Sequence, residues 1–395
     1  MAGPLNGIRV LSFGRMLSGP YAAMLLCDLG AEVIKIEAPG IGDLSRLANP
    51  IYGSISSYFL SINRGKKSIT LDLKNDKARD IIFELVKKVD ILLENFRPGV
   101  MERLGLSYDV LKGMNPKLIY ASISGFGQIG PYAQKPAFDM IAQGMGGLVS
   151  MTGHPDGPPA RAGYSIGDIG ASLFTTTSIL AALHERNISG EGQAIDISML
   201  DCQVALAENA CSRHFATGEI AKPLGSRHPL FTPFEAFPTK DGYMILIIMK
   251  EDDWKTFCNL VDKTDWIHNE KFKSLEARLE NYDTFLSEMN QLIRTKTTAQ
   301  WMKLLEENKL MCGPVNNIEQ VVNDPHIIER EMILEVRNEK NENFKVIGTP
   351  MKFSKTPCEI EKASPELGEN TEEILLNILK MDEDEIQNLR NSNII

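Results

Sequence analysis

The strongest constraint on the fold is a regular alternation of strand-like and helix-like segments over the first two hundred residues. Short apolar runs ending in glycine- or proline-marked loops predict strands at 8–13, 31–37, 67–73, 91–96 and 117–124. Helices are predicted at 20–29 and 75–90, the second because Ile81, Ile82, Leu85 and Val89 share one helical face. This alternation predicts an α/β fold with a parallel sheet covered by helices on both faces.

In a sheet of this kind, ligands bind outside the carboxyl ends of the strands. The loops after Phe13, Phe96 and Ser124 are therefore where we expect the chemistry. The net charge of −10 argues against a general nucleic-acid binder, because neutralising phosphates requires a basic face. We find neither a signal-like first segment nor an apolar run of roughly 18 residues, and so expect a cytoplasmic protein without membrane association.

The length of 395 residues exceeds what a single hydrophobic core supports, so we expect two domains. The character of the chain changes near residue 220, where Lys222 to Pro229 has the composition of a loop. We predict the first part of a large domain at 1–200, a linker at 201–229, and a small domain at 230–325. The tail at 326–395 begins with a second linker.

Several common signatures are absent or incomplete. Gly125 to Gly130 spells G-x-G-x-x-G after a strand, but no helix opens there and no acidic residue follows about twenty positions on. A nicotinamide site is therefore disfavoured, and the loop is interpreted as one that lets backbone approach a ligand closely. There is no phosphate-binding P-loop, no H-E-x-x-H and no C-x-x-C pair, so we expect no metal and no resident cofactor.

Asp168 is the most informative acidic residue. It stands between two glycines in the run GDIGAS, next to a long apolar helix. The glycines leave room for a bulky substrate, and a helix amino terminus favours an ionised carboxylate. An aspartate here is also a common helix N-cap, so spacing alone leaves a catalytic and a structural interpretation open.

Two arginines offer a phosphate site beside a predicted strand end. Arg97 lies in the run ENFRPG, and Arg103 follows six residues later. Guanidinium groups suit phosphate and diphosphate. Pattern alone also fits two solvated surface arginines.

Many segments together resemble the class III CoA-transferases, in the same order and over nearly the whole chain. They are LNGIRVLSFGRMLSGPYAAMLLCDLGAEVIKIE, INRGKKSITLDLK, ENFRPGVMERLG, SGFGQIGPY, DMIAQGMGGLVSMTG, GDIGAS, DGYMILI, CGPVNNI and LGENTEEIL.

The resemblance implies a Rossmann-like large domain made from both ends of the chain, with the tail returning to it. A smaller α+β domain would be inserted between, and two chains would form an interlocked homodimer. It implies that Asp168 is the nucleophile. The residues it implies for the coenzyme A site are Leu71, Asp72, Leu73, Lys74, Asn95, Phe96, Arg97 and Arg103.

The implied activity is transfer of coenzyme A from an acyl-CoA donor to a free carboxylic acid, through an aspartyl mixed anhydride and an aspartyl-CoA thioester. The donor and acceptor stay open: succinate, a 2-hydroxy acid, an aromatic acid, carnitine-like acids and bile acids all fit. Some relatives have Gln where this chain has Leu17 and a nucleotide-binding Arg where it has Ala38, and their glycine-rich flap is not visible.

Two other functions are compatible with this fold. One is a coenzyme A-binding protein without catalysis. The other is a 2-methylacyl-CoA racemase, which resembles this chain but uses a histidine where Phe138 stands. Because Phe138 has no exchangeable proton, transfer is preferred over racemisation.

Overall fold

The computed structural model describes residues 3–395, which form two compact units. The large unit contains the chain up to Val149, Arg161–Glu219 and Pro325–Ile395, and the small unit contains Ser150–Ala160 and Ile220–Asp324. The linker predicted at 201–229 is wrong over its first part. Helices α9 (Met199–Leu206) and α10 (Glu208–Thr217) occupy it, and Gly218 in a left-handed conformation ends the second.

The large unit is built on a six-stranded sheet in the order β5-β2-β1-β6-β7-β8, with every neighbouring pair parallel. The predicted parallel sheet is therefore confirmed. The sheet grows outward in both directions from β1 and β6, so its topological switch point lies between these two strands. The strands are β1 (Arg9–Ser12), β2 (Glu32–Glu37), β5 (Lys67–Thr70), β6 (Ile91–Glu94), β7 (Ile119–Ser124) and β8 (Ala194–Ser198).

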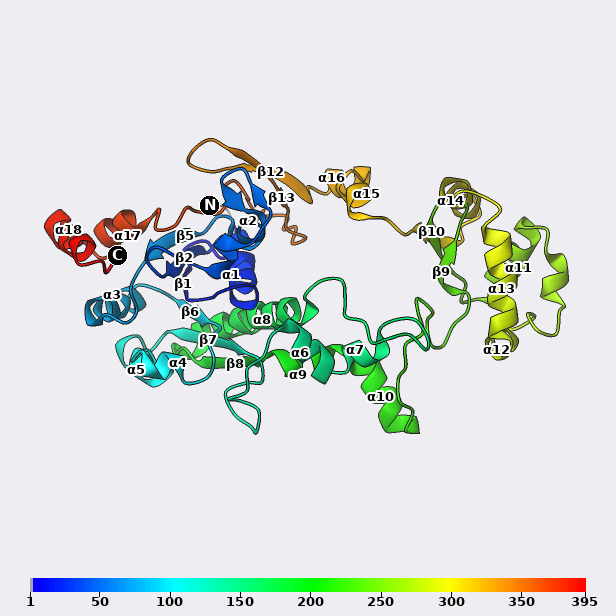
Figure 1. The fold of residues 1–395 in the computed structure, drawn as a ribbon, viewed down its shortest axis with the longest axis horizontal. Coiled ribbons are helices and arrows are strands. Elements are labelled where there is room, and N and C mark those ends of the chain that lie inside the picture. Colours follow the sequence, from blue (N-terminus) through cyan, green and yellow to red (C-terminus); the bar gives the residue numbers. More distant parts are fainter. Residues whose placement is uncertain (1–2) are drawn as a thin grey trace. The chain divides into compact units, whose positions relative to one another are not determined.

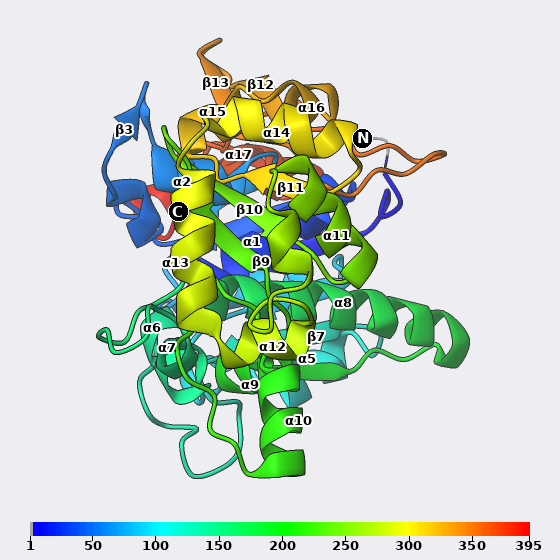
Figure 2. The ribbon, with the colours of Figure 1, turned by 90° about the vertical axis from the view of Figure 1, so that its right-hand side faces the viewer.

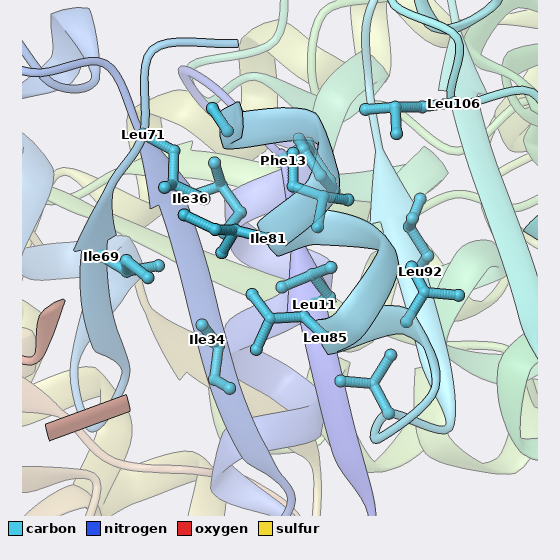
Figure 3. Close-up of a cluster of buried hydrophobic side chains, with 14 of the residues drawn as sticks. Leu11, Phe13, Ile34, Ile36, Ile69, Leu71, Ile81, Leu85, Leu92 and Leu106 are labelled. Atoms are coloured by element: carbon cyan, nitrogen blue, oxygen red, sulfur yellow. The ribbon is translucent and has the colours of Figure 1, made fainter. Parts of the chain in front are cut away.

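Helices cover both faces of this sheet, and side chains of each strand point alternately to the two cores. Leu11 and Phe13 pack toward α3, as Figure 3 shows, whereas Val10 packs on the opposite face with α1 and α8. One face carries α3 (Asp76–Val86), α5 (Tyr108–Met114), α17 (Thr371–Asn377) and α18 (Glu383–Asn391). The other carries α1 (Ser18–Asp28), α8 (Ile166–Ser189) and α9.

Helix α8 positions the candidate nucleophile and is the longest described helix, at 24 residues. Among residues 3–395 it alone is long and apolar enough to cross a membrane, and half of its most apolar window is buried. Its Ala171, Ile179 and Leu183 belong to the core against the sheet, as in a core helix of a globular domain. Its opposite face leaves apolar side chains exposed: Leu173, Phe174, Leu180 and Ile188.

The small unit has an antiparallel sheet in the order β11-β10-β9, formed by Met311–Pro314, Tyr243–Ile247 and Phe234–Pro238. Helices α11 (Glu251–Leu260) and α13 (Tyr282–Ile293) lie on one face of it (Figures 1 and 2). They bury Trp254, Phe257 and Phe285 in a separate core. The segment Ser150–Ala160 joins this unit because Gly225 donates a backbone hydrogen bond to the Gly153 carbonyl at 2.8 Å.

The remaining elements are short. They are η1 (Leu44–Leu47), β3 (Ile51–Tyr52), β4 (Ile55–Ser56), α2 (Ser57–Asn63), α4 (Val100–Arg103), α6 (Asp139–Met145), α7 (Leu148–Met151), η2 (Thr264–Ile267), α12 (Leu275–Glu280), α14 (Thr298–Glu307), α15 (Ile318–Val322), α16 (Pro325–Glu329), β12 (Ile333–Arg337) and β13 (Asn343–Ile347).

Candidate active site

A cavity of about 370 Å³ lies at the carboxyl edge of the large sheet, at the switch point between β1 and β6. Its walls come from the loop after β1, the loop after β6, the start of the loop after β7, and the first turns of α6 and α8. All three loops in which the sequence located the chemistry therefore meet at one place. The lining includes Arg15, Leu17, Asn95, Phe96, Arg97 and Asp168.

A smaller cavity of about 110 Å³ adjoins the first, since Arg15 and Phe96 line both. The Arg15 guanidinium lies over the Phe96 ring, 5.0 Å from its centroid. The other walls of the small cavity include the predicted coenzyme A segment Leu71, Asp72, Leu73 and Lys74. The structure thus brings seven of the eight residues predicted to bind coenzyme A to two adjoining cavities.

Arg103 is the eighth and lines neither cavity. It is exposed at the end of α4, while Arg97, also exposed, lines the larger cavity. Gly99 between them has φ of 85°, and a Cβ there would lie 3.1 Å from Nη1 of Arg103. Glycine at this turn therefore lets the Arg103 guanidinium fold back toward the segment that carries Arg97.

Asp168 is the third residue of α8, so the structural interpretation as its N-cap is wrong: Ser165 holds that position. Asp168 lines the larger cavity together with Ser18, and one hydroxyl, that of Ser172, donates to the backbone carbonyls of both residues. Ser18 opens α1, so the carboxylate faces the amino terminus of a second helix. Burial, and then the charge of Asp139, raise the pKa of Asp168 to about 6, although Ser18 acts in the opposite direction.

Asp139 is a buried neighbour that the sequence did not single out. Its Oδ1 accepts from the Gly167 N–H at 2.8 Å, and its Oδ2 accepts from Nε2 of Gln143 at 2.7 Å. A Cβ at residue 167 would lie 2.8 Å from the same Oδ1, so glycine there allows this approach. Asp139 thus fixes the backbone directly before Asp168 and adds a second negative charge. The sequence signal that could have pointed to Asp139 is an acidic residue in the first turn of a helix that follows a loop.

A buried ion pair holds the loop between β1 and α1. Nζ of Lys35 lies 2.8 Å from Oδ2 of Asp43, and both side chains are 1% exposed. The same ammonium donates to the Gly14 carbonyl, and Oδ1 of Asp43 accepts from the Met16 N–H. Gly14 and Met16 flank Arg15, so this pair fixes the loop that brings Arg15 to the cavity.

The three positions at which the resemblance led us to expect a difference from CoA-transferases or racemases also line these cavities. Leu17 and Phe138 line the larger one and Ala38 the smaller one. Phe138 is 71% exposed and precedes α6 as its N-cap residue. None of the described residues lining the larger cavity is a histidine. No group of three or more His, Cys, Asp or Glu side chains in residues 3–395 is placed to hold a metal ion.

Comparison with known proteins finds one family and several of its members. The model of the family described as CoA-transferase family III matches residues 5–371. The succinate–glutarate CoA-transferase of Agrobacterium fabrum is 37% identical, over 94% of this chain and 95% of the relative. The acetyl-CoA:oxalate CoA-transferase of Acetobacter aceti is 37% identical over 89% and 90%. Human succinyl-CoA:glutarate CoA-transferase is 33% identical over 99% and 90%.

Solved structures agree with the fold. A CAIB/BAIF family protein from Brucella suis superposes with a TM-score of 0.88 at 32% identity, covering 96% of this chain and 100% of the other. Rv3272 from Mycobacterium tuberculosis gives a TM-score of 0.83 at 33% identity, covering 94% and 99%.

Proposed function

This chain belongs to CoA-transferase family III, and we propose that it moves coenzyme A onto a short dicarboxylic acid with Asp168 as the covalent nucleophile. That it is a CoA-transferase follows from the family and its relatives. The observation that carries the proposal for Asp168 is its position: a carboxylate that lines a cavity at the sheet's switch point and forms no ion pair among the described residues.

In the first half-reaction, one oxygen of Asp168 attacks the thioester carbonyl of the donor. The C–S bond breaks, coenzyme A leaves as a thiolate, and an acyl-aspartyl anhydride remains. The thiolate then attacks the aspartyl carbonyl carbon and expels the donor acid as its carboxylate. Asp168 is left as an aspartyl-CoA thioester.

The second half-reaction reverses these steps with the acceptor. The acceptor carboxylate attacks the aspartyl thioester and displaces the thiolate, giving a second anhydride. Attack of the thiolate on the acceptor's carbonyl forms the new acyl-CoA and frees Asp168. The acyl group stays activated throughout, so no external energy source is needed. Gly125 lines the cavity, and backbone N–H groups of this glycine-rich loop are suited to stabilise the oxyanions.

Coenzyme A is proposed to bind across the two adjoining cavities. Leu71 to Lys74 and Phe96 supply walls, and Arg97 with Arg103 supplies the charge for its phosphates. Asn95 lines the larger of the two cavities.

The dicarboxylic substrate class rests on charge and on the relatives. Four cations line the larger cavity: Arg15, Arg97, Lys135 and Arg161. A second carboxylate on the acceptor would therefore meet a favourable field. The relatives described above are named for succinate, glutarate and oxalate.

A homodimer is proposed as the working assembly. The exposed apolar side chains Leu173, Phe174, Leu180 and Ile188 on α8 favour coverage by another surface, because apolar patches of this kind mark interaction sites. A second copy of the chain is the occupant that we propose.

The test is to incubate the protein with a panel of acyl-CoA donors and free acids and to identify the thioesters formed by mass spectrometry. Dicarboxylic acids should be converted faster than monocarboxylic acids of the same length. Hydroxylamine added after acyl-CoA should modify Asp168. Conversion of monocarboxylic acids alone would refute the substrate class, and an unmodified Asp168 in an active sample would refute the mechanism.

A further inference from the structure

The side chain of Asn95 has all its amide hydrogens engaged inside the protein. Its Oδ1 accepts from the Arg15 N–H at 2.8 Å. Its Nδ2 donates to the Arg15 carbonyl at 2.9 Å and to Oγ of Ser18 at 3.0 Å. An amide nitrogen has two hydrogens, so neither remains for a ligand. The amide hydrogens of Asn95 therefore hold the segment around Arg15 and Ser18.

The orientation of this amide is fixed by the backbone of Arg15. If the amide oxygen and nitrogen were exchanged, Nδ2 would face the Arg15 N–H, which is another donor. Oδ1 would then face the Arg15 carbonyl oxygen, which is another acceptor. Only the observed orientation satisfies both backbone groups, and it directs the second Nδ2 hydrogen to Ser18.

The close approach requires two glycines. A Cβ on Gly19 would lie 3.0 Å from Cγ of Asn95, and a Cβ on Gly14 would lie 2.9 Å from the Gly19 carbonyl carbon. Side chains at these positions would push the loop after β1 away from the loop after β6. Glycine at positions 14 and 19 thus allows Asn95 to reach Ser18.

The consequence falls on the hydroxyl of Ser18, which is 4% exposed. Since Oγ accepts from Asn95, its single proton is free to be donated, and Asp168, whose pKa Ser18 lowers, lines the same cavity beside it. We propose that Asn95 and Ser18 are positioning residues: Asn95 directs the Ser18 proton to the Asp168 carboxylate, which keeps the nucleophile ionised and oriented. The role in transfer rests on the proposed function of Asp168, whereas the effect on its ionisation does not.

The other groups around Asp168 set the direction of the effect. Asp139 from α6 opposes ionisation, and Tyr58 from α2 is close enough for its own pKa to be raised by burial and then by the Asp168 charge. The further charged groups lining the cavity are Arg15, Arg97, Lys135 and Arg161. Loss of the Ser18 hydroxyl removes a contribution that lowers the pKa of Asp168, while burial and Asp139 still raise it, so ionisation of Asp168 should move to higher pH.

The experiment compares the pH dependence of kcat/KM in the parent, Ser18→Ala, Asn95→Ala and the double variant. Ser18→Ala should move the acid limb upward by about one pH unit, the effect of losing one hydrogen bond to a charged group. The rate should fall about fivefold at pH 6 and hardly at all at pH 8. Asn95→Ala should move the limb in the same direction and should add nothing in the Ser18→Ala background.

Ser172→Ala is the matched structural control. Its hydroxyl contacts the backbone carbonyls of Ser18 and Asp168 rather than the carboxylate. It should lower stability and leave the acid limb in place. The proposal would be overturned if Ser18→Ala left the acid limb in place. It would also be overturned if Asn95→Ala moved the limb as far in the Ser18→Ala background as it does in the parent.

A second readout separates this proposal from the proposed function. With 13Cγ-labelled aspartate, the resonance that disappears in Asp168→Asn reports the titration of Asp168 whether or not transfer occurs. Its midpoint should rise in Ser18→Ala. A raised midpoint in a protein that transfers no coenzyme A would uphold the positioning role and refute the function. An unmoved midpoint in a protein that does transfer coenzyme A would uphold the proposed function and refute the positioning role.

Discussion

Replacing Asp168 with asparagine should abolish transfer and at the same time stabilise the fold at neutral pH. Asparagine has the same shape and keeps an oxygen that can accept from Ser18, but it cannot attack a thioester. Asp139 cannot take over, because it is 7% exposed and both its oxygens already accept short hydrogen bonds. We expect turnover to fall by roughly a thousandfold or more.

The gain in stability follows from the electrostatics of the site. The pKa of Asp168 is raised from 3.8 to about 6 by burial and then by Asp139. Such a rise corresponds to about 3 kcal/mol of unfavourable folding free energy in the ionised form. The side chain is partly open to the cavity, so screening should reduce this to about 2 kcal/mol.

The dependence on pH has a definite sign. Below about pH 4 the carboxyl is protonated in both folded and unfolded states, so the variant has no advantage. Between about pH 4 and 6 only the unfolded state is ionised, and the advantage of the variant grows with pH. Above about pH 6 both states are ionised and the advantage stays at its full value.

Urea unfolding at pH 4 and pH 7.5, together with thioester analysis, measures both effects. Asp201→Asn is the matched control, because Asp201 is likewise the third residue of its helix, α9, but is exposed and lines neither cavity. It should keep the parent's rate and stability. Near-parent turnover in a folded Asp168→Asn protein, or a variant less stable than the parent at pH 7.5, would refute this account of the site.

Four further outcomes are expected. Arg97→Gln and Arg103→Gln should each raise the KM for CoA esters, more at low salt where phosphate attraction is least screened; unchanged calorimetric binding of free coenzyme A by both would exclude the assignment. Sedimentation should find a dimer that does not dissociate at nanomolar concentration without unfolding, and a stable folded monomer would contradict it. A 2-methylacyl-CoA of one configuration in deuterated water, without acceptor, should neither exchange its α-proton nor lose configuration; rapid exchange would favour racemisation. Asp43→Ala should cost about 3–5 kcal/mol by leaving the Lys35 ammonium unpaired in the interior, as measured by urea unfolding, and a cost below about 1 kcal/mol would contradict this.

The fold could be predicted wherever periodicity and burial agree. Helix α3 and strands β1, β2, β6 and β7 are buried strongly enough for their patterns to stand out, and all were predicted. Strand β8 was missed, because it lies at the edge of the sheet and is only partly buried, so it lacks a long apolar run. The helices at 199–217 were missed because the breakers that suggested a linker, Lys222 to Pro229, lie beyond them.

The candidate site could be predicted only in part, since hydrogen-bond partners are not encoded in local spacing. Asp168 and the loops after three strands were found from glycine flanks and strand ends. Ser18 contacts Asp168 across 150 positions, and Asn95 contacts Ser18 across 77. Asn95 was predicted to bind coenzyme A, which stays a prediction; that its amide is bonded to Arg15 and Ser18 is revealed only by the fold.

Acids in the interior of the large unit fall into two groups, those paired with a cation and those that are not. Asp28 pairs with Arg64, Asp43 with Lys35 and Glu37 with Arg46. Glu94, at the end of β6, is buried too, but it accepts from the Phe96 N–H and forms no ion pair among the described residues. At the cavity, Asp139 and Asp168 form no ion pair among the described residues and receive only neutral donors. Pairing them with cations would be the stable arrangement, but it would quench the nucleophile that transfer requires. At Asp168 the missing cation fits a cost of function, and removing the charge of this residue should return stability while it removes the reaction.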